Sequence, residues 1–246
     1  MFCIFGMKPI TLSEIKPLMT PVQHFSDCYM ISSIGALARS EDGRKILSKN
    51  IAHRKDGFRI RFQNLDERRQ DFFVTKDEMD HLVSLDKYYN EVVQKYEQNP
   101  IIKAIEVAMN KLLEKYPWKK PLVSRLMRCQ ERFEYNKPSN FLEMFTGKTP
   151  FILNEGGVRM TLKNKIPETQ DLFERLKNEQ DYSFIAGTGM RGKNGLVSYH
   201  CYTVLGVDSD NFVKLYESRK KESITLNFRQ AIDSLKFFVG YFKDMM

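Results

Sequence analysis

The sequence predicts an α+β protein with a largely helical N-terminal lobe (residues 1–150) and an antiparallel-sheet C-terminal lobe (residues 151–246). Three observations predict this class. Apolar residues recur at helical spacing in the first half, short strand-like runs begin near residue 182, and turn-forming residues separate those runs. Helices followed by strands are typical of α+β proteins. The 246 residues suffice for one packed core, with the lobe boundary expected near residues 147–157.

The composition is that of an ordinary globular protein, with 42% hydrophobic and 28% charged residues. The net charge of +8 permits attraction to phosphate, anionic lipid or acidic protein without selecting among them. Basic pairs such as Arg68-Arg69 are interspersed with acidic residues and accompany no recognition motif, so we expect no nucleic-acid site. No apolar run approaches the roughly 18 residues of a membrane-spanning helix, so no membrane span is expected.

The cysteines indicate a reducing compartment. They stand at positions 3, 28, 129 and 201 and form neither a disulfide framework nor a zinc-ligand spacing. We therefore expect free thiols, no bound metal and a cytoplasmic location. The first ten residues lack the basic segment and cleavage site of a signal peptide, so the mature chain is expected to begin here. Export by a route without a cleavable signal is also compatible with the sequence.

The first predicted element is a buried helix that begins at Cys28. Ser26 and Asp27 carry side chains that can cap a helix, and an apolar stretch follows over residues 28–38. Met30, Ile31 and Ile34 belong to a stripe at helical spacing, whereas the opposite side is made of small residues. This pattern indicates a helix packed on both sides.

The rest of the first half predicts a strand pair and three helices. Between residues 58 and 75, FRIRFQN alternates apolar and charged residues, residues 64–69 are mostly polar and FFVT follows, which together indicate two short strands. A long amphipathic helix is expected over residues 101–115, directly after Pro100. Two shorter helices are expected at residues 141–145, ended by Gly147, and at residues 169–178.

The second half predicts strands at residues 182–189, 197–207 and 212–218. The last two are separated by the polar segment 208–211, whose Asp, Ser and Asn residues favour a turn. Strands joined by such a short turn pair antiparallel, and this indicates the antiparallel sheet of the C-terminal lobe.

Cys28 and His200 are the candidate chemical groups. The amides and dipole of a helix N-terminus favour an anion, so a thiol at Cys28 would have a lowered pKa. Taken singly, a cysteine is more often a small buried apolar residue, and a histidine in a strand is more often structural. Catalysis requires only that the two meet in space, which their separation of 172 residues permits.

Five segments, in order, resemble the calpain-type branch of the papain-like cysteine proteases. QHFSDCYMISSIGALA resembles the family's nucleophile segment, AIEVAMNKL one of its helices, and FLEMFTG a further helix that ends at glycine. LFERLKNEQDYSFIAGTGMRGKNGLVSYHCYTVLGV is similar to the segment that presents the catalytic histidine. ITLNFRQAIDSLKFFVGYF is similar to the family's closing stretch. The resemblance implies a papain-like fold with the active site between the lobes, and a single catalytic core over residues 1–246 without appended domains.

The resemblance also implies the roles of individual residues. Cys28 would be the nucleophile, His200 the general base, and Gln23 an oxyanion donor, although Gln23 lies one residue nearer the cysteine than in the family. The family's Asn-Pro-Trp motif is absent, and Glu217 stands at the asparagine position. A carboxylate can orient an imidazole, so Glu217 is the expected third member, with Asp208 as the reserve candidate.

No cofactor is expected. Glu106 matches an acidic position in the family's calcium-binding helix, but Met19 stands where the second acidic residue is required. Calcium needs several oxygen ligands, so no calcium requirement is expected.

The predicted function is that of a cysteine endopeptidase that hydrolyses protein or peptide amide bonds through a thioester. The changed Asn-Pro-Trp motif leaves a second hypothesis, a catalytically inactive protease-like binding protein. An isopeptidase or transamidase is a third, because the same nucleophile serves every acyl transfer. The expected partner is a protein or peptide substrate, while substrate preference and oligomeric state are not readable from the sequence.

Overall fold

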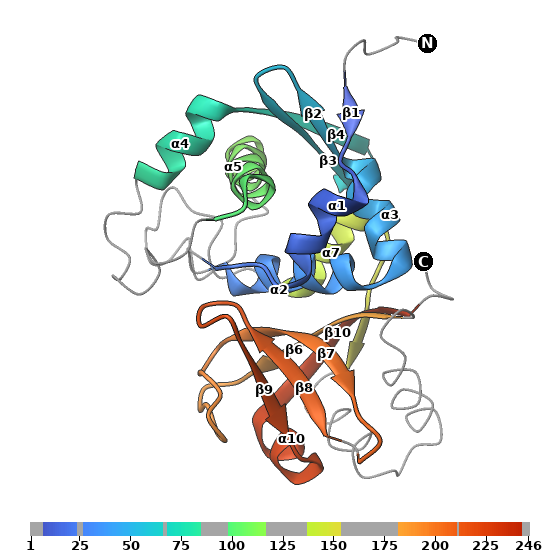
Figure 1. Cartoon of the computed structure of the whole chain (residues 1–246), viewed down its shortest axis with the longest axis vertical. Coiled ribbons are helices and arrows are strands. Elements are labelled where there is room, and N and C mark those ends of the chain that lie inside the picture. The colour runs from blue at the N-terminus through green and yellow to red at the C-terminus, as the bar shows by residue number, and fades with distance from the viewer. Residues whose placement is uncertain are drawn as a thin grey trace.

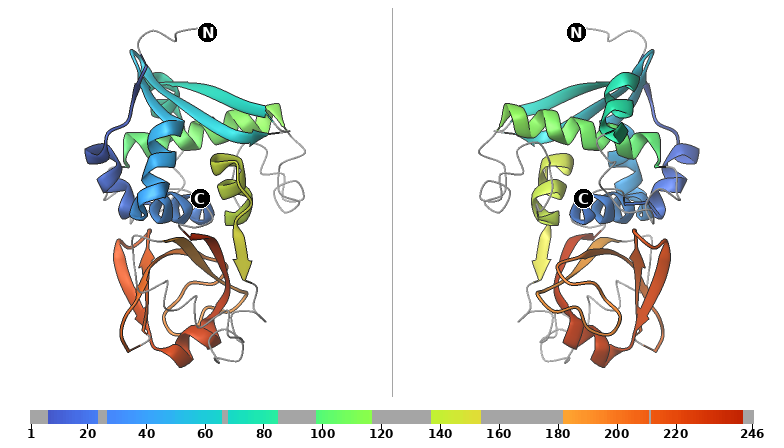
Figure 2. Two further views of the ribbon diagram at one scale, coloured as in Figure 1. Left: turned by 90° about the vertical axis from the view of Figure 1, so that its right-hand side faces the viewer. Right: turned by 90° about the vertical axis from the view of Figure 1, so that its left-hand side faces the viewer.

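The structure is a computed structural model that describes residues 7–23, 27–65, 68–84, 98–116, 137–153, 182–210 and 212–242. Within these residues it contains seven α-helices and two antiparallel sheets, which confirms the predicted mixed α+β class. Figure 1 shows the elements of the first half above and the C-terminal sheet below, with helix α2 lying between them. Figure 2 shows the same two bodies from the sides.

The N-terminal body combines helices with a four-stranded sheet of order β1-β2-β3-β4. The predicted strand pair is confirmed as β3 and β4, but β1 and β2 extend it, so this half is less helical than the sequence indicates. Its strands are β1 (Lys8–Pro9), β2 (Ile51–Arg54), β3 (Gly57–Leu65) and β4 (Arg68–Thr75). Its helices are α1 (Leu12–Ile15), a 3-10 helix (Lys16–Met19), α2 (Cys28–Arg39), α3 (Glu41–Asn50), α4 (Lys76–Ser84), α5 (Pro100–Lys115) and α7 (Pro138–Thr146).

Helix α2 begins at Cys28 as predicted, but its cap differs from the prediction. Asp27 occupies the N-cap position with φ −113° and ψ 26°, and its side chain makes no capping bond. The extended backbone that lets a cap side chain reach the first amides is absent here. The Asp27 carbonyl instead accepts hydrogen bonds from the amides of Met30 and Ile31, at 2.8 and 3.1 Å. Ser26 lies outside the described residues.

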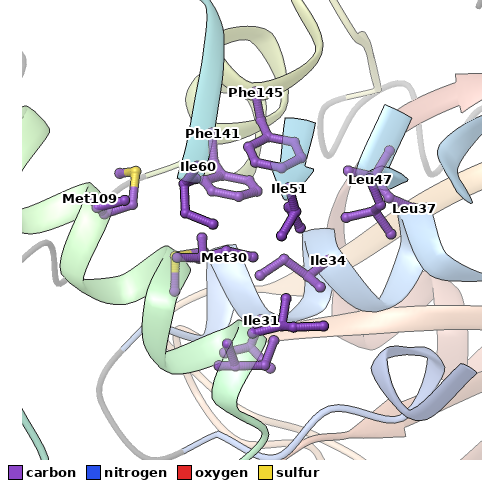
Figure 3. Packing of buried hydrophobic residues seen from close by; sticks show 14 of the residues in the cluster. Met30, Ile31, Ile34, Leu37, Leu47, Ile51, Ile60, Met109, Phe141 and Phe145 are labelled. Atoms are coloured by element: carbon purple, nitrogen blue, oxygen red, sulfur yellow. The ribbon is translucent and has the colours of Figure 1, made fainter. Parts of the chain in front are cut away.

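The apolar stripe of α2 forms the centre of the main core. Ile31, Ile34 and Leu37 are fully buried, and full burial of such a side chain contributes about 1.5–3 kcal/mol. The rings of Phe141 and Phe145 on α7 stack at 5.4 Å and cover the stripe. Figure 3 shows α2 side chains packed with residues of β2, β3, α5 and α7: Met30, Ile31, Ile34, Leu37, Ile51, Ile60, Met109, Phe141 and Phe145.

Two further helices confirm their predicted ends. Pro100 is the first residue of α5, and the Asn99 side chain caps it by accepting from the Ile101 amide at 2.8 Å. Helix α7 ends at Gly147, whose φ of 78° is the left-handed conformation that glycine adopts without strain. The helix expected at residues 169–178 lies outside the described residues.

The C-terminal body is a six-stranded antiparallel sheet of order β5-β10-β6-β7-β8-β9. The predicted strands at 182–189 and 212–218 are confirmed as β6 and β8, but the strand predicted at 197–207 starts only at Cys201. Tyr199 has a left-handed φ of 50°, which interrupts extended backbone just before that point. The elements are β5 (Phe151–Leu153), β6 (Tyr182–Thr188), β7 (Cys201–Val207), β8 (Val213–Glu217), β9 (Glu222–Leu226), α10 (Phe228–Ser234) and β10 (Leu235–Phe242).

Helix α2 also packs closely on the sheet, against β6 and β7. The Thr203 hydroxyl donates to the Ser32 carbonyl at 3.1 Å, and Arg39 donates to the Leu205 carbonyl at 3.3 Å. A Cβ at Gly35 would lie 2.6 Å from the Thr203 hydroxyl, so the absence of a side chain permits this approach. The contacts advance in the same direction along both elements, so α2 and β7 run side by side and parallel.

Gly187 on β6 leaves room for a packed aromatic ring, and the nearby Gly189 serves as the control position. A Cβ there would overlap the ring of Phe237 on β10, whereas one at Gly189 would meet only the flexible side chain of Lys236 at 3.0 Å. We expect Gly187→Ala to lower the free energy of unfolding by about 1–3 kcal/mol through overpacking. Gly189→Ala is expected to stay within about 0.5 kcal/mol. Urea unfolding measures both, and equal values would contradict this account.

Candidate active site

Cys28 is the first residue of α2, and its side chain is half-buried at the edge of the main core. The N-terminal end of a helix carries partial positive charge from its unpaired amides. Cys28 lies against Cys201, the first residue of β7, so this end of the helix lies beside the start of that strand. Cys28 therefore occupies the position predicted for a nucleophile.

His200 directly precedes β7, and its backbone is fixed on both sides by Thr188. The His200 amide donates to the Thr188 hydroxyl, and the Thr188 amide donates to the His200 carbonyl, both at 3.0 Å. The imidazole meets the Tyr202 ring edge-on, with centroids 4.8 Å apart and an interplanar angle of 85°. These contacts give the imidazole one orientation.

Glu217, the last residue of β8, holds the imidazole of His200. Its Oε1 lies 2.8 Å from His200 Nε2, and both side chains are only 1% exposed. The Arg219 amide donates to the same oxygen at 3.0 Å and fixes the carboxylate in turn. Because Nε2 faces Glu217, Nδ1 is the ring nitrogen left for Cys28.

The reserve candidate, Asp208, lies elsewhere. Its Oδ1 accepts from the Phe212 and Asp210 amides at 2.9 and 3.1 Å in the turn between β7 and β8. The antiparallel pairing puts this turn and the β7 start at opposite ends of the strand pair. The geometry therefore pairs His200 with Glu217.

The three groups perturb one another's pKa values in the sense of an ion pair. A hydrogen bond with Cys201 and the hydrogen bond and charge of His200 lower the pKa of Cys28 well below its ordinary value, although burial opposes them. Burial lowers the pKa of His200, but the hydrogen bonds and charges of Cys28 and Glu217 outweigh it and raise this pKa to about 9. Burial raises the pKa of Glu217, but His200 leaves it lowered overall. At neutral pH the arrangement favours a thiolate, an imidazolium and a carboxylate.

Gln23 joins the same group of residues through Ser218. Its side chain is 1% exposed, and its amide oxygen accepts a hydrogen bond from the Ser218 hydroxyl at 3.1 Å. The backbone amide of Gln23 also donates to the Ser218 carbonyl, at 3.2 Å. Since Ser218 follows Glu217, this pair anchors Gln23 beside the end of β8. Its oxygen accepts from Ser218, and the N–H groups of the same amide are of the donor type that an oxyanion needs.

Two residues of the site have no sequence signal of their own. Cys201, next to His200, contacts Cys28, and Ser218, next to Glu217, binds Gln23. Their positions beside two candidate residues are the only hint, because the contacts depend on how α2 and the segment at Gln23 pack on the sheet.

No metal centre is found within the described ranges, where no group of three or more His, Cys, Asp or Glu residues could hold an ion. Glu106 is fully buried on α5 and accepts from Gln98 Nε2 at 2.6 Å. Met19 ends the 3-10 helix. Among the described residues, no helix is long and apolar enough to cross a bilayer.

A cavity of about 670 Å³ lies next to the candidate site rather than in it. Its lining includes Thr20, Val22 and Gln98 on one side and Tyr216 and Lys221 on the other. None of the residues that form the ion pair borders it, so this cavity does not present a ligand to the Cys28 sulfur.

Comparison of the sequence with known proteins assigns the chain to no family. No protein-family model matches the chain, and no match is found among curated proteins. The chemistry that this chain can perform is therefore inferred from the residues of the site.

Proposed function

We propose that this chain is a papain-like cysteine peptidase of the calpain type, which hydrolyses protein or peptide amide bonds through a thioester. The observation that carries the proposal is the convergence of Cys28, His200 and Glu217. A helix N-terminus supplies the thiol. The residue before β7 supplies a buried imidazole, and the last residue of the neighbouring β8 supplies a buried carboxylate 2.8 Å from it. The position of α2 between the helical body and the sheet supports a papain-like arrangement of two lobes.

Acylation follows from the charge states of the pair. The Cys28 thiolate attacks the carbonyl carbon of the scissile amide, and the C=O electrons move onto the oxygen. As the oxyanion collapses, the C–N bond breaks and His200 donates its Nδ1 proton to the leaving amine. Glu217 holds the ring throughout by its bond to Nε2.

Deacylation reverses the proton transfer. Neutral His200 accepts a proton from water as the water oxygen attacks the thioester carbon. The C–S bond then breaks, the carboxylic acid product leaves, and the Cys28 thiolate is restored beside the imidazolium. The carboxylate of Glu217 stabilises this charged state, because it accepts from the ring in both steps.

The direct test is digestion of a peptide library made from a proteome, with products read by mass spectrometry. We expect hydrolysed termini in the wild-type digest and none with Cys28→Ala. Products joined to a second amine instead of water would identify a transamidase and replace the peptidase assignment. An intact library would overturn the peptidase assignment, and together with a Cys28 thiol of ordinary pKa it would favour a binding protein.

Gln23→Ala is expected to lower kcat by a factor on the order of 10², because one oxyanion donor is lost. The backbone amide of Cys28 would remain as the second donor. The rate at which iodoacetamide alkylates Cys28 is expected to stay unchanged, since alkylation forms no oxyanion. Ser218→Ala, which leaves the amide in place but removes its hydroxyl partner, should lower kcat less. Equal kcat in Gln23→Ala and wild type would remove Gln23 from the mechanism.

The pH dependence of kcat/KM follows from the pKa values of Cys28 and His200. The pKa of Cys28 is lowered well below its ordinary value and that of His200 is raised to about 9. Activity requires a deprotonated thiol and a protonated imidazole, so kcat/KM should be high at neutral pH and fall as pH rises through about 9. Initial rates between pH 5 and 10.5 measure this. A basic limb near the ordinary histidine pKa would contradict the shift.

A further inference from the structure

Cys201 is a second thiol at the candidate active site, and the proposed mechanism gives it no role. It directly follows His200 and is the first residue of β7. Cys201 is 7% exposed, and neither it nor Cys28 forms a disulfide.

The strand direction places Cys201 opposite Cys28. Cys201 belongs to the core cluster of α2, whereas Tyr202 and Val204 belong to the cluster on the other face of the sheet. Cys201 and Thr203 therefore share the face that meets α2. The two residue steps from Cys201 to Thr203 span about 6.6 Å of strand.

Thr203 fixes the register of this contact. Its hydroxyl donates to the Ser32 carbonyl at 3.1 Å, and Cys28 lies one helical turn before Ser32, about 6 Å along the axis. Because α2 and β7 run in the same direction, Cys201 precedes Thr203 on the strand by nearly the same distance as Cys28 precedes Ser32 on the helix. The two sulfurs meet at the N-terminus of α2.

We propose that Cys201 is a positioning residue for the nucleophile, whose S–H donates a hydrogen bond to the Cys28 thiolate and holds it toward His200. The inference rests on the proposed role of Cys28 as the attacking group. The Cys201 thiol thereby supplies a donor from the sheet side, in addition to the imidazolium.

In the hydrogen bond between the two thiols, Cys201 is the donor and Cys28 the acceptor. The hydrogen bond to Cys28 and burial raise the pKa of Cys201 well above its ordinary value, while the pKa of Cys28 is lowered. Cys201 therefore keeps its proton, and the negative charge stays on Cys28. Among the other described titratable or charged groups, His200 acts on Cys28 directly, Tyr202 interacts with the charge on Cys28, and Glu217 acts through His200 with Arg219 beside it. The buried carboxyl of Asp27 directly precedes Cys28 in the chain.

The test is the pH dependence of Cys28 alkylation by iodoacetamide, with the modified residue identified by peptide mass spectrometry. In Cys201→Ala the donor is lost, and we expect the midpoint of the rate profile to rise by about one pH unit, since a hydrogen bond to a charged group is of this strength. Cys201→Ser keeps a donor and is expected to hold the midpoint within about 0.3 pH unit of wild type. Ile185→Val is the matched control. It removes one methylene from the same core cluster, on β6, but no hydrogen-bond donor, so it should not move the midpoint.

A Cys201→Ala midpoint equal to that of wild type would overturn the proposal, as would equal shifts in the alanine and serine variants. Circular dichroism and thermal unfolding establish that each variant is folded before titration. The measurement uses no substrate. Shifted midpoints with an uncleaved peptide library would therefore refute the peptidase alone, whereas library cleavage with coincident midpoints would refute the role of Cys201 alone.

Discussion

Cys28→Ala is expected to abolish peptide hydrolysis, with kcat/KM reduced by a factor on the order of 10⁴ or more, because the nucleophile is lost and the second thiol at the site, Cys201, is buried and protonated. Labelling by thiol-directed electrophiles at this position should disappear as well. The measurements are initial rates on a cleaved library peptide and intact-protein mass after treatment with iodoacetamide.

The variant should fold normally, because Cys28 is only half-buried at the edge of the core. Cys129→Ala replaces a cysteine with no assigned role and is expected to retain wild-type rates. Full activity in Cys28→Ala would exclude the proposed mechanism, whatever the other variants show.

Glu217→Ala is expected to lower kcat/KM by a factor on the order of 10², because the imidazole loses the bond that orients it, and misplacement of a reacting group has an effect of this size. Removing the carboxylate also removes a stabilising partner of the imidazolium. The pKa of His200 should fall from about 9, and the basic limb of the rate profile should move to lower pH.

Two variants separate orientation from charge. Glu217→Gln keeps an acceptor oxygen without charge, so the basic limb should move to lower pH while kcat at pH 7 falls by less than about tenfold. Glu222→Ala is the matched control, since Glu222 pairs with Glu217 across β8 and β9 but is exposed. Its rates should equal those of wild type. If the rate profile of Glu217→Ala kept its basic limb near pH 9, as in wild type, Glu217 would not be the partner of the imidazolium.

The glutamate gives this site an unusual charge balance. A thiolate, an imidazolium and a carboxylate together carry one net negative charge, and the His200 and Glu217 side chains are each 1% exposed. An asparagine in place of Glu217 would leave the site neutral. The partial positive charge at the start of α2 and the N–H groups directed at the anions offset the excess: the Arg219 amide donates to Glu217 at 3.0 Å. The additional donor at Cys201 acts in the same direction.

Periodicity predicted the elements that carry the candidate site. The apolar stripe and small residues after Cys28 predicted α2, and β-rich runs separated by a turn predicted β7 and β8. The prediction was wrong where a local backbone conformation overrode the pattern. The left-handed φ of Tyr199 delays β7 until after His200, and the backbone of Asp27 prevents its side chain from capping α2.

The sequence by itself determined the α+β class and the start of α2 at Cys28, because helical and strand periods and turn preferences depend on near neighbours along the chain. The identity of the candidate residues comes from the resemblance to the calpain-type proteases. The tertiary structure alone decided that Glu217 rather than Asp208 holds His200, that Ser218 binds Gln23, and that Cys201 lies against Cys28. These contacts join residues as far as 195 positions apart. They depend on the packing of α2 across the sheet, and the pKa shifts follow because burial strengthens each interaction between charges.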